Sequence, residues 1–387
     1  MRRINLILLA ATLFLGSCVE PFVPDTARYE DILAIECRIS DDYTAPARLM
    51  ISTAAPIVTE EGDRLTRQPK LVSGATAQIL SRNGIIYPFT ETAPGTYLIT
   101  DQGSFVAGMD YKLIINYGGN QFESDFERLR PGCPIENIRA SHIVNRIEED
   151  GEVVDGYRFY VTSRDSGTEP AWYRWDMEAT WEYKSPYTAT HIWDGREQKP
   201  ETNREFRICW KTKTINGLYI GSTSGLSQNQ VIDAPLNFES QYGDELTVRY
   251  CLTVRQYSIN PSAYAFWEIV DNLVNQAGGL YETQPFRIEG NIRCTTDPNL
   301  PVAGVFEVAG VSVARAFVDR PQEFTVVPLE CVLSEVGTQD YPWFRLPVNS
   351  FVTQDTQTGK FLTASPACYD CRQRGGTLTK PPFWEDF

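Results

Sequence analysis

Short runs of β-forming residues alternate with turn signals in the first third of the chain. The pair Asn83-Gly84 is a strong signal for a two-residue hairpin turn, and Gly118-Gly119 marks another turn. Roughly seven strands in about 100 residues, with a turn about every 8–12 residues, are typical of an immunoglobulin-like sandwich. We therefore predict an immunoglobulin-like β-sandwich domain over residues 31–131, ended by the segment Pro131-Gly132-Cys133-Pro134. The predicted strands lie in Ile32–Ile39, Leu49–Thr53, Ala75–Ser81, Ile85–Phe89, Tyr97–Thr100, Tyr111–Tyr117 and Gln121–Phe126.

Residues 132–387 continue the β pattern and add one helix. Glu245–Tyr257 places apolar residues at every second position, as in a strand with one buried face. Asn260 can cap a helix that begins with Pro261, and Gly278-Gly279 can end it. Between them an apolar stripe at helical spacing consists of Phe266, Ile269, Val270, Leu273 and Val274. We predict a mainly β protein, in which a larger, mostly β C-terminal domain over residues 132–387 carries one prominent helix near residues 261–276.

The N-terminus has the pattern of a bacterial lipoprotein signal. A basic start precedes the apolar run Ile4–Phe14, which is too short to span a bilayer. Leu15-Gly16-Ser17-Cys18 resembles a lipobox, so we predict a lipoprotein signal peptide over residues 1–17 and lipidation of Cys18. Several acyl chains, at ~0.8 kcal/mol per buried CH₂, give stable attachment to the membrane. An ordinary signal peptide that ends beside a cysteine is the alternative. Residues 18–30, with two prolines, are predicted to be a lipidated tether.

Composition and charge exclude several functions. The 387 residues carry 50 acidic and 35 basic side chains, and this acidic balance argues against a nucleic-acid partner because phosphate binding needs a basic face. Two histidines, His142 and His191, are too few for a three-histidine zinc site. Gly221–Gly225 has the glycine spacing of a nucleophile elbow, but Thr223 holds the nucleophile position. Since the HExxH, GxGxxG, P-loop and EF-hand patterns are also absent, we predict a protein that is not an enzyme and uses no metal or cofactor.

The cysteines predict disulfides. Eight cysteines follow Cys18, an even number that suits an oxidising compartment and allows 105 pairings. Cys368 and Cys371 have CxxC spacing, for which a half zinc site and a redox pair are the alternatives to a structural role. We favour the structural role, in which these cysteines attach the C-terminal tail to the body or pair locally. The disulfide candidates are Cys209, Cys251, Cys294, Cys331, Cys368 and Cys371.

An ordered series of motifs resembles a known family. The series runs from Pro21-Phe22-Val23-Pro24 through Val254-Arg255-Gln256-Tyr257-Ser258, Ala263-Tyr264-Ala265-Phe266-Trp267, Glu289-Gly290-Asn291-Ile292 and Gly304-Val305-Phe306 to Cys368-Tyr369-Asp370-Cys371-Arg372 and Lys380-Pro381-Pro382-Phe383-Trp384. It is similar to the outer-membrane lipoproteins of Bacteroidota type called domain of unknown function 4249 (DUF4249). The resemblance implies an accessory lipoprotein of the outer membrane, encoded beside a TonB-dependent receptor for nutrient or metal-complex uptake. It supplies no catalytic residues.

Three functions are compatible with these observations. The first is a lipid-anchored binding protein whose Trp172, Trp175, Trp181 and Trp193 contact a small ligand or a partner. The alternative for these aromatics, and the more frequent one, is a place in a β core or at a sheet edge. The second is a structural cell-envelope lipoprotein with no soluble ligand. The third is a histidine-independent glycan hydrolase that works with two carboxylates, although no pair stands out in the sequence. We favour the first.

Overall fold

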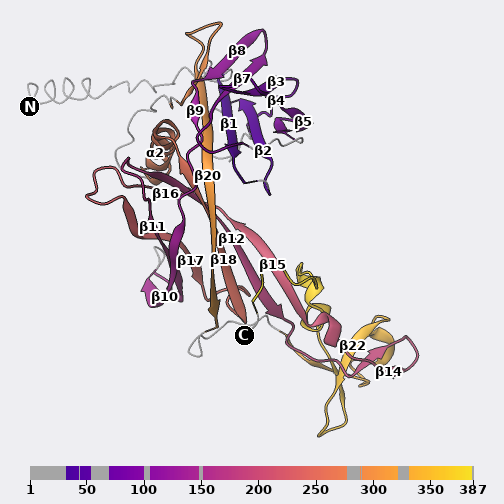
Figure 1. The fold of residues 1–387 in the computed structure, drawn as a ribbon. Coiled ribbons are helices and arrows are strands. Elements are labelled where there is room, and N and C mark those ends of the chain that lie inside the picture. The colour runs from indigo at the N-terminus through magenta and orange to yellow at the C-terminus, as the bar shows by residue number, and fades with distance from the viewer. Residues whose placement is uncertain are drawn as a thin grey trace, which may run out of the picture.

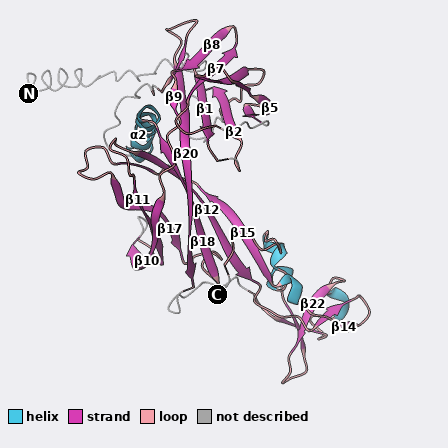
Figure 2. Ribbon diagram, in the orientation of Figure 1, coloured by secondary structure: helices cyan, strands magenta, loops and turns pink. Residues whose placement is uncertain are grey.

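The computed structural model describes residues 32–42, 44–53, 69–99, 105–147, 151–276, 288, 290–320 and 331–385. The predicted signal peptide, the tether and Cys18 lie outside the described residues. The described chain is mainly β with one long helix, α2 (Pro261–Gln276), which confirms the predicted mainly β class and the predicted helix (Figure 2). In these ranges no helix has the length and apolarity needed to cross a bilayer.

The largest sheet joins both halves of the chain (Figure 1). Its strand order is β15-β12-β18-β20-β1-β2-β6-β5, with β16 paired to β12. The bounds are β1 Leu33–Ser40, β2 Ala47–Thr53, β5 Thr90–Ala93, β6 Thr96–Ile99, β12 Trp172–Lys184, β15 Ile208–Ile215, β16 Ile220–Ser222, β18 Arg249–Ile259 and β20 Val302–Asp319. Strand β20 pairs in parallel with β1 through its first half and antiparallel with β18 through its second half. Hydrogen bonds therefore connect the segments assigned from sequence to two separate domains.

A second sheet packs on the β1 end of this long sheet. Its order is β19-β8-β7-β3-β4, with β9 paired to β7. The bounds are β3 Thr76–Ser81, β4 Ile86–Pro88, β7 Asp110–Tyr117, β8 Asn120–Ser124, β9 Glu127–Arg128 and β19 Ile292–Cys294. The two layers share one apolar core, to which Ile35, Leu113 and Phe306 belong. The sandwich thus takes β19 and part of β20 from sequence far beyond residue 131. The predicted hairpin joins β3 and β4, but its loop has three residues, Arg82-Asn83-Gly84, because the Ser81 backbone N–H donates to the Ile85 carbonyl. Gly84 alone of these three has a positive φ, +89°, as the last residue of a three-residue hairpin loop requires.

A third sheet, β10-β11-β17, encloses a second core against the other end of the long sheet. Its strands are β10 Ile135–Ile147, β11 Val153–Arg164 and β17 Gln230–Ser240. In β20, Phe306 enters the first core and Val318 enters the second. Residues separated by an even number of positions lie on the same face of a strand, as Phe306 and Val318 do. Both cores therefore lie on the same face of the long sheet. Val305 and Ala309 lie an odd number of positions from Phe306, so their side chains are on the other face of β20. They pack with residues of α2, which therefore covers that face.

A small distal lobe, residues 188–201 and 334–363, lies at the far end of the molecule (Figure 1). Its sheet has the order β14-β13-β22-β23-β21. The bounds are β13 His191–Trp193, β14 Gln198–Pro200, β21 Ser334–Val336, β22 Ser350–Gln354 and β23 Phe361–Thr363. Trp193, Leu346 and Val352 form its own core.

Candidate functional site

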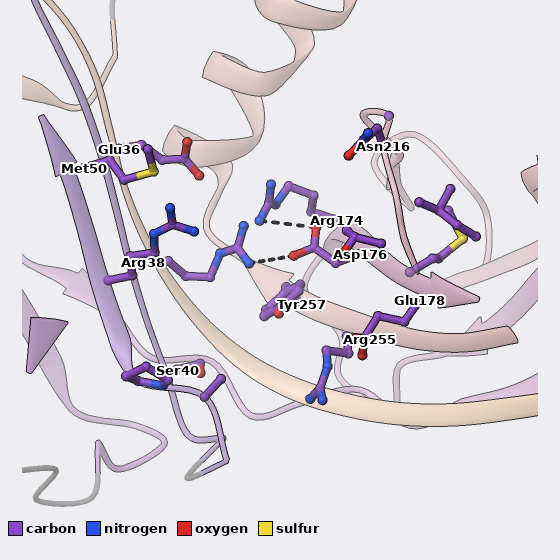
Figure 3. Close-up of a pocket in the computed structure, with 17 residues that line it drawn as sticks. Glu36, Arg38, Ser40, Met50, Arg174, Asp176, Glu178, Asn216, Arg255 and Tyr257 are labelled. Atoms are coloured by element: carbon purple, nitrogen blue, oxygen red, sulfur yellow. Dashed lines mark hydrogen bonds and ion pairs between the residues drawn. The ribbon is translucent and has the colours of Figure 1, made fainter. Parts of the chain in front are cut away.

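A cavity of about 610 Å³ opens on the α2 side of the long sheet, at the junction of its two halves. Its wall comes from β1, β2, β12 and β18, from the end of β15 with the turn after it, and from residues just before β2 (Figure 3). A cavity of this size is within the range of small-molecule sites. Because strands from both halves of the chain contribute, the cavity exists only in the assembled sheet.

Strand alternation directs charged side chains toward this cavity. In β1, Ile35 and Cys37 enter the sandwich core, while Glu36 and Arg38, which alternate with them, line the cavity. In β12, Arg174 and Asp176 line the cavity, and the residues between and after them face the second core. The same period of two that builds the cores therefore builds a charged wall on the opposite face.

Four charged side chains form a closed ring at this wall. Arg38 places Nη1 2.7 Å from Asp176 Oδ2 and Nε 2.7 Å from Glu307 Oε1. Arg174 places Nε 3.1 Å from Glu307 Oε2 and Nη2 3.5 Å from Asp176 Oδ1. Figure 3 shows Asp176 between the two guanidinium groups. Positive and negative groups alternate around the ring, so each of the four charges has two neighbours of opposite sign.

Two aromatic rings contact the ring of charges, those of Trp267 and Tyr257. Trp267 of α2 donates a hydrogen bond from Nε1 to Glu307 Oε2 at 2.9 Å, and Glu307 is 1% exposed. The Arg38 guanidinium lies 4.4 Å from the centre of the Tyr257 ring, within cation–π range. Burial raises the pKa of Glu307, and Arg38 acts against this rise. These contacts hold the ring of charges in one geometry, so the wall of the cavity is preorganised.

Three more charged residues of the wall are not in the ring and have no hydrogen bond or ion pair with another described residue. They are Glu36, Arg48 and Glu178. A fourth, Arg255, is paired at 2.7 Å with Asp42. Burial raises the pKa of the Glu36 carboxyl, although the side chain is exposed to the cavity. The free groups of both signs can bind a polar ligand without breaking the ring.

The structure places the predicted tryptophans mostly in the cores. Trp175 and Trp181 are buried in the second core, where their Nε1 atoms donate to Gln256 Oε1 at 2.8 Å and to Asp244 Oδ1 at 3.1 Å. Trp193 is buried in the distal lobe against Trp343. The predicted binding role of Trp175, Trp181 and Trp193 is therefore corrected, because their rings are not accessible to a ligand. The alternative of a core role holds for them.

Trp172 differs from the other three tryptophans because it is only partly buried. Its ring packs against the α2-side core, and the Arg130 guanidinium lies 5.1 Å from the ring centre. One of its faces is thus already covered, and it does not line the charged cavity.

The cysteines form two disulfides among the described residues. Cys209 pairs with Cys371 and Cys331 pairs with Cys368, so the CxxC cysteines bond to separate partners rather than to each other. This arrangement matches the predicted attachment of the C-terminal tail to the body.

Two of the disulfide candidates are corrected. Cys251 and Cys294 are free and buried. Cys251 has Thr180 and Phe317 as its neighbours on the adjacent strands, and Cys294 lies opposite Phe122. Neither cysteine has another cysteine as its partner in the strand register.

The charged cavity was not predicted from the sequence. The available signal was the charge at Glu36 and Arg38, which alternates with apolar residues inside a predicted strand, and the charge at Arg174 and Asp176 inside the aromatic-rich strand. Such residues usually belong to a solvated face. Only the pairing of β1 with β20 shows that Glu307 meets Arg38.

Among the described residues no group of three His, Cys, Asp or Glu side chains is arranged to hold a metal ion. A family model described as a domain of unknown function (DUF4249) matches residues 19–315. No curated protein matches the chain. Every residue that lines the charged cavity falls within the matched segment, whereas the C-terminal part of the distal lobe falls outside it.

Proposed function

We propose that this chain, which belongs to the DUF4249 family, is a lipid-anchored binding protein of the outer membrane that holds a small polar ligand and partners a TonB-dependent receptor. The single observation that carries the proposal is the preorganised charged cavity. Small-molecule sites combine a concave, largely pre-formed wall with a few fixed polar groups. The cavity at the junction of β1, β12 and β18 has both properties.

The proposals of a membrane anchor and of a receptor partner are supported by the sequence and not by the cavity. The lipobox-like segment before Cys18 supports lipid attachment, and the resemblance of the motifs supports a receptor for nutrient or metal-complex uptake. In this proposal the protein hands over or retains a ligand beside the receptor and carries out no covalent chemistry.

The test is detergent extraction of the full chain from native membranes through a C-terminal tag, with mass spectrometry of the co-purifying proteins and small molecules. The expected result is a TonB-dependent receptor in near-equal amount. A Cys18→Ser variant serves as the matched control, since it should leave the membrane fraction. Recovery of the protein alone, or with peptidoglycan-associated proteins, would overturn the import role.

The second candidate is a structural envelope protein, and the surface of the distal lobe favours it. Phe344 is 82% exposed and Val348 is 60% exposed on this lobe. Exposed apolar side chains on a projecting lobe suit permanent docking to another protein. This alternative predicts a stable complex on extraction from which no small molecule is released.

A further inference from the structure

The charged side chains of the cavity wall that form no ion pair indicate a class of ligand. This inference rests on the proposed binding function. Arg38, Arg174 and Asp176 are occupied by the ring with Glu307, and Arg255 is occupied by Asp42. The charged groups that can bind a ligand without breaking one of these ion pairs are those that the protein leaves unpaired.

Two such charges of opposite sign lie on adjacent strands. In the antiparallel β1–β2 pair, Arg48 is directly opposite Arg38, and Met50 is directly opposite Glu36. Glu36 and Arg48 are thus diagonal neighbours on the cavity face, at roughly 7–8 Å between their backbones. Arg48 is exposed, and no ion pair joins it to Glu36 or to any other residue in the described ranges.

The third unpaired charged residue, Glu178, lies apart from Glu36 and Arg48. The β12–β18 register places Asp176 opposite Arg255, so Glu178 is diagonal to Arg255 on the other side of the cavity. Arg255 already binds Asp42, and Glu178 faces a position that is partly neutralised. The Glu36–Arg48 pair is therefore the stronger recognition element.

The remaining surface of the cavity argues against a ligand that stacks on aromatic rings. Tyr257 is the aromatic residue of the wall, and it is 6% exposed with the Arg38 guanidinium over its ring. A sugar or planar ligand needs an open aromatic face. Pro46, Met50 and Ile215 instead offer apolar contacts for a short aliphatic chain.

We infer that the cavity binds a small zwitterion, an amino acid or a short peptide with free ends, with its ammonium group on Glu36 and its carboxylate on Arg48. Arginine forms bidentate hydrogen bonds with a carboxylate, and a carboxylate accepts charge-assisted hydrogen bonds from an ammonium group. The ligand replaces the missing ion pair between the two strands.

The test is calorimetric titration of the full-length protein in detergent with trialanine that has free ends. The comparison probes are N-acetyl-trialanine, trialanine amide, acetate and maltotriose. Free trialanine is expected to bind at least about ten-fold more tightly than either blocked peptide, because each block removes one charge-assisted hydrogen bond.

Charge-removing variants assign the two ends of the ligand. Glu36→Gln should abolish the preference for the free ammonium group while the preference for the free carboxylate persists, and Arg48→Gln should do the reverse. Arg204→Gln and Glu205→Gln are matched controls on exposed residues at the opposite end of β15, and they should bind as the wild type does.

The outcomes separate this inference from the proposed function. Equal affinity for free and blocked peptides would overturn the inference that the ligand is a zwitterion. If only acetate or maltotriose binds, and the Arg48→Gln variant loses this binding, the inference of a zwitterionic ligand is wrong but the cavity still binds a ligand. If no probe binds, the inference falls, and the receptor partnership is still decided by the extraction experiment.

Discussion

Glu307 is a carboxylate buried between two arginines and one tryptophan. Its Oε2 accepts from Trp267 Nε1 and lies near Arg174 Nε, while Oε1 lies near Arg38 Nε. Removal of one partner of a buried ion pair leaves the other charge without compensation, and this usually costs more than the pair contributes. The residue joins β20, β1, β12 and α2 at one point.

We therefore expect Glu307→Gln to lower the free energy of unfolding by about 3–5 kcal/mol. The measurement is the midpoint and slope of urea unfolding. Glu335→Gln is the matched control, because Glu335 forms an exposed ion pair with Lys360 at 2.7 Å and should contribute less than about 1 kcal/mol. Equal effects of the two substitutions would show that the buried ring does not stabilise the junction.

Glu36 carries a stability penalty that depends on pH. Burial raises its folded-state pKa above the ordinary 4.5, with Glu307 and Asp176 acting in the same direction and Arg38 and Arg48 in the opposite one. A raised carboxyl pKa means that the folded state binds the proton more tightly than the unfolded state. Stability is then lost as the pH rises from about 4.5 through the folded-state pKa.

Glu36→Gln should accordingly raise the melting temperature at pH 7, with a gain of at most about 1 kcal/mol because the side chain is exposed to cavity water. Below about pH 4 the difference from the wild type should disappear, since the carboxyl is then protonated in both states. Calorimetry at the two pH values measures this, with Glu205→Gln as control. A variant that is less stable at pH 7 would contradict the assignment.

Among the elements, strand β20 and the two disulfides connect parts of the chain that are distant in sequence. The Cys331–Cys368 bond spans 37 residues and closes the segment that carries β21, β22 and β23. The Cys209–Cys371 bond attaches the following segment to β15. A small lobe with a short core needs such covalent support more than the long sheet does.

The double variant Cys331→Ser/Cys368→Ser should therefore lose about 3–4 kcal/mol of local stability in the distal lobe. Hydrogen exchange should become faster in residues 334–363 and stay unchanged in β1 and β20. Cys251→Ala, which affects a cysteine outside any disulfide, is the control and should leave exchange in the lobe as in the wild type. Hydrogen exchange that becomes equally fast in the long sheet and in the distal lobe would contradict a stabilising effect limited to the lobe.

At the scale of the whole molecule, one sheet supports two cores and one cavity. The first core is completed by Ile292 of β19 and by Val302, Phe306 and Val308 of β20. A fragment limited to residues 31–131 lacks these side chains and exposes the β1 edge that pairs with β20.

We expect the 31–131 fragment to show no cooperative thermal transition and no near-ultraviolet circular dichroism of a packed core. Residues 31–387 are the control and should show both signals. A cooperative transition in the fragment would mean that the first sandwich is an independent domain, as the strand pattern of residues 31–131 alone suggests.

The sequence predicted most of the elements and few of their long-range contacts. The helix at residues 261–276 was predictable because Pro261 at its start and its apolar stripe are local signals, although the Asn260 side chain bonds to Arg128 and Arg130 and does not cap the helix. The hairpin between β3 and β4 was predictable from Asn83-Gly84, although its loop has three residues and not two. The burial of Trp175 was left open, since an aromatic strand residue has the same pattern on a core face and on a binding face. The two disulfides could not be chosen among 105 pairings without the fold.

The mainly β class, the prominent helix and the positions at which charge alternates with apolar residues each depend on neighbours a few positions away, so they follow from the amino-acid sequence. The tertiary structure alone decided that Arg38, Arg174, Asp176 and Glu307 form one ring and that Glu36 and Arg48 are left uncombined in a cavity. The parallel β1–β20 pairing creates these neighbours from opposite ends of the chain. Strand partners at such separation are set by burial and backbone hydrogen bonding over the whole sheet, and no local pattern encodes them.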